Sequence, residues 1–190
     1  GFKVYSFLMN LNKGYSKKEK IKNLTVTHVA KDTDCSTFIQ EKFLEGLHLS
    51  NYEFNRHKTN FTSKAFKIKT PVHATIDSVI KGTCLARDLV NEPLSHLNAE
   101  KLSAIIKKLA QEAGFQLQVL NEKNIKALKM GGVLSVNKGS IAKPTFNILT
   151  YKSKKSKKKN PIVLVGKGVM YDTGGLSLKS TLNSMDMMKC

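Results

Sequence analysis

The spacing of apolar side chains along the chain predicts short strands that alternate with helices. Residues 3–8 and 24–30 carry β-branched and aromatic side chains near the two-residue period of a strand. Residues 37–49 place large apolar side chains near the spacing of one helical face, which predicts an amphipathic helix. The stretch 61–77 predicts extended chain interrupted at Pro71. The first part of the chain therefore has a β/α alternation.

Two helices with marked ends follow. Apolar residues keep helical period from residue 77 until an Asn-Glu-Pro sequence at 91–93 stops it. Asn98 is a good N-cap for a helix over residues 99–113, and Gly114 stands where a left-handed terminator belongs. The ends of this second helix are the best defined in the sequence.

Three strands are predicted after residue 114. They lie at 115–120, 145–151 and 162–165, with a short helix at 122–130 and a small apolar piece at 133–136 after the first of them. The last strand is uniformly apolar, which is typical of a strand buried on both faces. Strands that alternate with helices indicate an α/β sheet domain, and we expect it to begin after about residue 75.

The charge of the chain raises the question of a polyanionic partner. It has 32 basic and 14 acidic side chains, a formal net charge of +18 over 190 residues, and basic surfaces bind phosphates through counterion release. Only two of the basic residues, Arg56 and Arg87, are arginines, whereas specific readout favours guanidinium groups and stacking aromatics. The lysine run at 152–159 predicts a solvated hairpin tip or loop, and an anionic docking site is the alternative. Nucleic acid stays open as an unspecific partner.

The number of cysteines and the hydropathy of the chain indicate the cellular compartment in which the protein works. The three cysteines, Cys35, Cys84 and Cys190, are odd in number and widely spaced, which argues against a disulfide framework or a CxxC zinc pair and favours a reducing compartment. No apolar run reaches the roughly 18 residues of a membrane span, and the first residues lack the pattern of a signal peptide. We expect a cytoplasmic protein without a membrane partner.

The candidate chemistry lies between residues 161 and 180. The apolar strand runs into a Gly-Lys-Gly turn, which places Lys167 at the carboxyl end of a strand, where sites of α/β sheets collect. Asp172 follows, then Gly174 and Gly175, and then Lys179. A lysine whose pKa is lowered by burial beside a cation can ligate a metal, and a protonated lysine can polarise a carbonyl group. On spacing alone, a glycine-rich turn with an incidental ion pair is the alternative.

This segment also resembles a known family. The stretch VGKGVMYDTGGLSLK at 165–179 closely matches the signature block of the leucyl aminopeptidases, the cytosol aminopeptidase family of two-metal exopeptidases. LARDLVNEP at 85–93, MGGVLSVNKGS at 130–140 and MDMMK at 185–189 are similar to further segments of that family. The resemblance covers roughly residues 77–190.

The resemblance implies a fold, a reaction and a set of site residues. Residues 77–190 would begin the catalytic domain, a mixed sheet with flanking helices, and residues 1–76 would be part of a smaller α/β N-terminal domain. Lys167 and Asp172 look like metal ligands, and Lys179 looks like the lysine that stabilises the developing oxyanion. The complete enzyme would use two divalent ions, zinc or manganese, to hydrolyse N-terminal residues from peptides, and the family resemblance suggests a homo-oligomer, a hexamer.

The sequence departs from the family pattern at its end. A third aspartate ligand would follow the Met-Asp-x-Met-Lys-x sequence, and the chain stops one residue earlier, at Cys190. The family's later segment with two further carboxylate ligands and an arginine is also absent. After residue 130 the only acidic residues are Asp172 and Asp186, too few to hold two cations. We therefore expect a truncated catalytic domain that binds no metal stably and is inactive alone, with a basic nucleic-acid-binding or structural assembly module as the alternative function.

Overall fold

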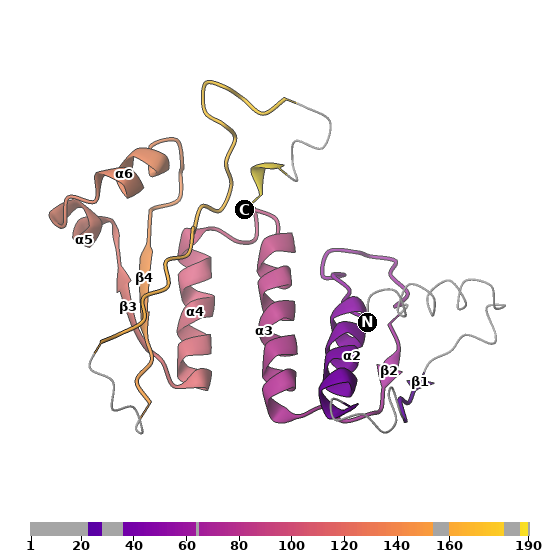
Figure 1. The fold of residues 1–190 in the computed structure, drawn as a ribbon. Helices are drawn as coiled ribbons and strands as arrows, with labels where there is room; N and C mark the ends of the chain where they lie inside the picture. The colour runs from indigo at the N-terminus through magenta and orange to yellow at the C-terminus, as the bar shows by residue number, and fades with distance from the viewer. Residues whose placement is uncertain (1–22, 28–35, 64, 154–159, 181–186, 190) are drawn as a thin grey trace. The chain divides into compact units, whose positions relative to one another are not determined.

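A computed structural model describes residues 23–27, 36–63, 65–153, 160–180 and 187–189 (Figure 1). The chain divides into two compact units, residues 1–91 and residues 92–190. Among the described residues, each unit contains helices and one small two-stranded sheet, which confirms the α/β class. The catalytic-domain boundary expected after residue 76 stays a prediction.

The first unit is a pair of helices beside a short parallel sheet. Helix α2 spans Ser36–Ser50 and packs against α3, Ala74–Asn91. Strands β1, Asn23–Leu24, and β2, Lys67–Ile68, pair in parallel. The core consists of apolar side chains that are less than a tenth exposed: Leu44, Leu47, Phe66, Ile76 and Ile80.

The strands of this unit are shorter than the sequence pattern predicts. The β1–β2 ladder ends because the side chain of Thr70 takes the place of the next backbone partner: Val26 N donates to Thr70 Oγ1 at 2.7 Å, and Thr70 Oγ1 donates to Val26 O at 3.0 Å. The helices of this unit agree better with the sequence pattern. The helix predicted over 37–49 is confirmed, and the helix predicted from residue 77 begins three residues earlier. The strand predicted at 3–8 lies outside the described residues.

The second unit is built on helix α4 and an antiparallel strand pair. Helix α4, Ala99–Ala113, packs on β3, Gln116–Leu120, which pairs with β4, Phe146–Thr150, from Gln116↔Thr150 to Leu120↔Phe146. The predicted caps of α4 are confirmed, since the Asn98 side chain accepts from Lys101 N at 2.9 Å and Gly114 has φ 73°. The buried apolar side chains of this unit are Leu97, Ala110, Leu120, Ile125 and Met188.

Two short helices connect β3 to β4. Helix α5, Glu122–Ala127, begins with a reciprocal capping box between Asn121 and Asn124 and ends earlier than predicted. Lys129 has φ 54° and breaks the helix, and α6, Gly131–Asn137, starts at the glycine pair. None of the described helices is long and apolar enough to span a membrane.

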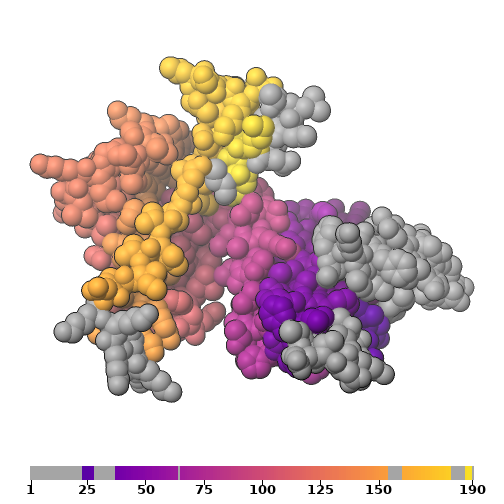
Figure 2. Space-filling model, viewed as in Figure 1, coloured from indigo at the N-terminus to yellow at the C-terminus, as the bar shows by residue number. Residues whose placement is uncertain are grey.

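The prediction of a buried strand at 162–165 is wrong. These residues form no strand, and their side chains are between 74% and 91% exposed; Figure 2 shows the segment after β4, in orange to yellow, on the surface. A strand needs a neighbour for its backbone N–H and C=O groups, and in the described part of the chain the only partner of β4 is β3.

Candidate metal-binding and catalytic site

The segment from Tyr171 to Lys179 forms a tight turn attached to the end of the described chain. Tyr171 makes an isolated antiparallel bridge with Lys189, and the backbone N–H of Asp172 donates to Met188 O at 2.7 Å. Lys179 N donates to Thr173 O at 2.9 Å and closes the turn. These backbone bonds hold the two ends of the turn near residues 187–189.

Glycine is required at the centre of the turn. Gly174 and Gly175 have φ values of 86° and 65°, in the left-handed region that favours glycine. A Cβ atom at Gly174 would lie 2.3 Å from the backbone oxygen of Ser177, whereas one at Gly175 would meet nothing within 4 Å. The chain can therefore reverse between Asp172 and Lys179 only because Gly174 has no side chain.

Replacement of Gly174 by alanine is expected to open this turn. Strain of roughly 1–3 kcal/mol would weaken the bond from Lys179 N to Thr173 O, and hydrogen exchange of the Lys179 amide would accelerate about tenfold. Gly175→Ala is the matched control, since it shares the positive φ without the clash and should accelerate exchange much less. Equal exchange rates in the two variants would contradict the role given to the Ser177 contact.

The turn brings a lysine and an aspartate side chain together. Lys179 Nζ lies 3.3 Å from Asp172 Oδ2 and donates to Met187 O at 3.0 Å. Asp172 Oδ1 accepts from Gly174 N at 2.9 Å. The side chains of Lys179 and Asp172 are 26% and 44% exposed, so the pair lies at the surface and is open to ligands.

The carboxyl group of Asp172 is held in its ionised form. The hydrogen bond from Gly174 N lowers its pKa most, followed by the hydrogen bond and the charge of Lys179. Desolvation opposes these effects, and the charge of Lys167 lowers the pKa of Asp172 by a still smaller amount. Asp172 is therefore an anion with one oxygen bound to the backbone and the other facing an ammonium group.

The three predicted site residues, Lys167, Asp172 and Lys179, differ in how closely the structure brings them together. Asp172 and Lys179 are in contact, while Lys167 is exposed and within electrostatic reach of Asp172. The Lys167 amine is exposed and not buried as the sequence predicts for a lysine that ligates a metal. Asp186 and most of the lysine run, residues 154–159, lie outside the described residues.

Sequence reasoning missed the acceptors that orient the pair. They are the backbone carbonyl groups of Met187 and Met188. A backbone acceptor leaves no side-chain signature, and the sole signal was the similarity of the MDMMK segment to the family pattern.

The LARDLVNEP segment has a structural role in the first unit. Its Asp88 accepts from Tyr52 Oη and from Arg56 Nη2, both at 2.7 Å. Its Arg87 donates to the backbone oxygen of Leu49 and lies over the Tyr52 ring. Both arginines of the chain therefore bind groups of the protein itself, and the segment ties α3 to the chain that follows α2.

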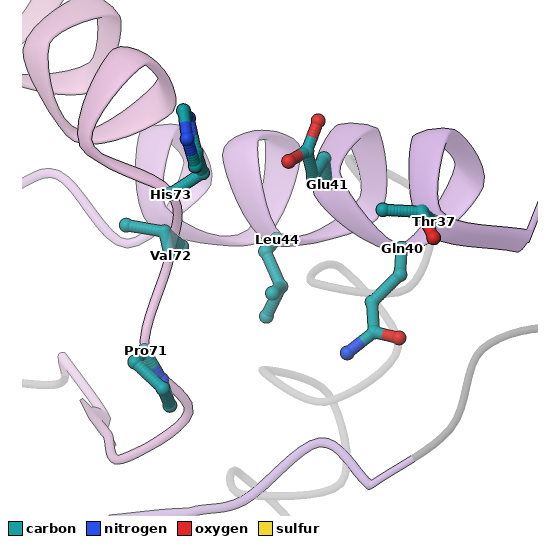
Figure 3. A pocket seen from close by; sticks show the side chains of 7 residues that line it. All are labelled: Thr37, Gln40, Glu41, Leu44, Pro71, Val72 and His73. Atoms are coloured by element: carbon teal, nitrogen blue, oxygen red, sulfur yellow. The ribbon is translucent and has the colours of Figure 1, made fainter.

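The first unit also has a hollow beside α2 (Figure 3). It has a volume of about 210 Å³ and is lined mainly by α2 and by residues 71–73, including Leu44, Glu41 and His73. Gln40 and Leu44 point to the same side of α2. Pockets for small ligands usually enclose about 300–1,000 Å³. This hollow is smaller and shares no residue with the Asp172 turn.

Comparisons with known proteins agree with the motifs. The model of the cytosol aminopeptidase family, catalytic domain, matches residues 84–190. A probable cytosol aminopeptidase of Chloroherpeton thalassium is 34% identical over 179 residues, which covers 81% of this chain and 35% of that protein. The chain spans 22% to 35% of the length of such curated relatives.

Solved structures give the same result for the fold. The bottromycin maturation enzyme BotP in complex with Mn aligns with a TM-score of 0.65 and 29% identity, covering 83% of this chain and 34% of that one. A mutant of tomato leucine aminopeptidase aligns with a TM-score of 0.71 and 24% identity, covering 90% of this chain and 37% of that one, and supports the fold alone. With a family match over more than half of its residues, and a relative that follows it through most of its length, this chain belongs to the cytosol aminopeptidase family.

Proposed function

We propose that this chain is part of a metal-dependent leucyl aminopeptidase, which hydrolyses N-terminal residues from peptides. The observation that carries the proposal is the 3.3 Å approach of Lys179 to Asp172 on a glycine-dependent turn, inside the segment that matches the family's catalytic domain. In this proposal residues 77–190 begin the catalytic domain, and residues 1–76 are part of a smaller N-terminal α/β domain.

The side chains of the turn suit a divalent cation. Asp172 offers an ionised, partly exposed carboxylate, a ligand that zinc and manganese both accept. Lys167 is the second proposed ligand, and its exposed amine lies within charge reach of that carboxylate. When bound, two such ions supply an activated water and spread the negative charge of the reaction. The Mn complex of the related BotP supports manganese as one candidate.

Lys179 is the proposed catalytic lysine. Its side chain is only 26% exposed and is held by Asp172 and the Met187 carbonyl group. A positioned ammonium group in a partly shielded site stabilises the negative charge that develops on the carbonyl oxygen of a peptide under attack. Asp172 and the Gly174 turn fix the position of that ammonium group before a substrate binds.

The same relatives support a proposal for the location and the substrates of the complete enzyme. Their description as cytosol aminopeptidases supports a cytoplasmic location and peptide substrates. The exposed apolar side chains at 162–165, together with Ile141 and Leu176, support assembly into a homo-oligomer, as in the hexamers that the family resemblance suggests. Nucleic-acid binding gains no support, since the guanidinium groups of Arg56 and Arg87 make contacts within the protein.

Hydrolysis of leucine-p-nitroanilide with Zn²⁺ or Mn²⁺ tests the proposal. The complete enzyme should release p-nitroaniline and lose this activity on addition of a chelator. The isolated 190-residue chain should show no turnover, because after residue 130 it offers only two carboxylates, Asp172 and Asp186, for two cations. Chelator-sensitive hydrolysis by the isolated chain would refute this ligand count, and an inactive complete protein would refute the function.

A further inference from the structure

The ammonium group of Lys179 lies at Oδ2 of Asp172, opposite the oxygen that accepts from the backbone. Oδ1 accepts the hydrogen bond from Gly174 N at 2.9 Å, while Oδ2 faces Lys179 Nζ at 3.3 Å. A cation that binds Oδ2 therefore shares that oxygen with the lysine.

Two oxygen atoms hold the ammonium group from different parts of the chain. One is the carboxylate oxygen of Asp172, and the other is the carbonyl oxygen of Met187 at 3.0 Å. Carboxylate and carbonyl oxygens are also the ligands that hard divalent cations accept. The ammonium group of Lys179 thus carries a positive charge and contacts the same kinds of oxygen atom that would bind a metal cation.

The backbone of Lys179 is fixed while its side chain can turn. Lys179 N is bound to Thr173 O at 2.9 Å, and the side chain is an unbranched stem of four carbons with a rotatable ammonium group. Leaving Asp172 requires only rotation about these bonds. Two cations at one carboxylate oxygen repel each other, so the lysine and a metal ion at Oδ2 each weaken the binding of the other.

From this geometry we propose that Lys179 is an internal cation that competes with the metal for Asp172 and withdraws from it when the metal binds. The inference rests on the proposed function, because it assigns Asp172 to a metal. It adds that the lysine weakens metal affinity and neutralises the carboxylate in the metal-free protein. The Lys179 side chain then becomes available to the substrate only after the metal has bound.

Mn²⁺ affinity of the metal-stripped complete enzyme tests the proposal, with free Mn²⁺ followed by electron paramagnetic resonance. Lys179→Met keeps an unbranched stem without the charge, and it should bind Mn²⁺ about tenfold more tightly than the wild type, the scale of one like-charge contact in a partly exposed site. Lys107→Met, on an exposed position of α4, removes the same charge elsewhere and should leave the affinity within about twofold. Lys179→Arg restores the cation and should return the affinity to near the wild-type value.

The outcomes separate this inference from the proposed function. If Lys179→Met binds Mn²⁺ no more tightly than Lys107→Met, the competition is refuted, whatever the activity of the enzyme. If the wild type binds Mn²⁺ and does not hydrolyse leucine-p-nitroanilide, the proposed function is refuted. The competition is then still decided by the Mn²⁺ affinities of Lys179→Met and Lys107→Met. If neither the wild type nor Lys179→Met binds Mn²⁺, both are refuted.

Discussion

Replacement of Lys179 by alanine in the complete enzyme is expected to lower kcat by about 100- to 1,000-fold, the range measured when a single donor to a developing oxyanion is removed. The metal content should persist, because the ammonium group is a neighbour of the carboxylate at 3.3 Å and not a ligand of the metal. Steady-state kinetics with leucine-p-nitroanilide and elemental analysis of the dialysed protein measure the two effects.

The specificity of this effect can be checked at a second lysine. Lys107→Ala changes the net charge equally from an exposed position of α4 and should leave kcat within about twofold. A fall in both kcat and metal content in Lys179→Ala would instead show that the lysine supports metal binding, and unchanged kcat would remove it from the catalytic site.

Replacement of Asp172 by asparagine is expected to remove the metal and, with it, the activity. Asparagine keeps the shape of the side chain and an oxygen that can accept from Gly174 N, so the turn should survive. The negative charge is lost, however, and the apparent metal affinity should fall on the order of 100-fold or more. Calorimetric titration with Mn²⁺ and the rate at saturating metal measure the result.

Asp77→Asn provides the control for this change. Asp77 is a partly exposed carboxylate on α3 that pairs with Lys81 at 2.6 Å, and its loss should leave metal affinity and rate near the wild-type values. Full activity in both Asp172→Asn and Lys179→Ala would refute the residue assignment as a whole.

Local signals explain what could be predicted of the fold. Helix α4 was predicted with its bounds because Asn98 and Gly114 act on their own turns of chain. The strand at 162–165 was predicted from apolar residues alone, but a strand also requires a partner, which the pattern of one segment cannot reveal. Likewise, the Thr70 side chain ends the β1–β2 ladder from 44 residues away.

In the candidate site, too, only the contacts between residues close in sequence could be predicted. Asp172 and Lys179 could be placed together from the sequence because a glycine-containing turn of six residues joins them. The Met187 and Met188 carbonyl groups could not, since any residue carries such an oxygen and only the chain path brings it to the site. Tyr52 was missed for a related reason, because its partner Asp88 lies 36 residues away.

The chain between α2 and β2 is closed at its base by one side chain. Asn51 Nδ2 donates to Phe66 O at 2.7 Å, and Phe66 N donates to Asn51 Oδ1 at 2.8 Å, so a single amide imitates a backbone pair. The exposed tip at Thr59 and Asn60 lies outside this clasp, and lengthening a closed loop adds little entropic cost. This tip is therefore the natural place to graft an epitope or a fluorescent probe without disturbing α2 and β2 on either side.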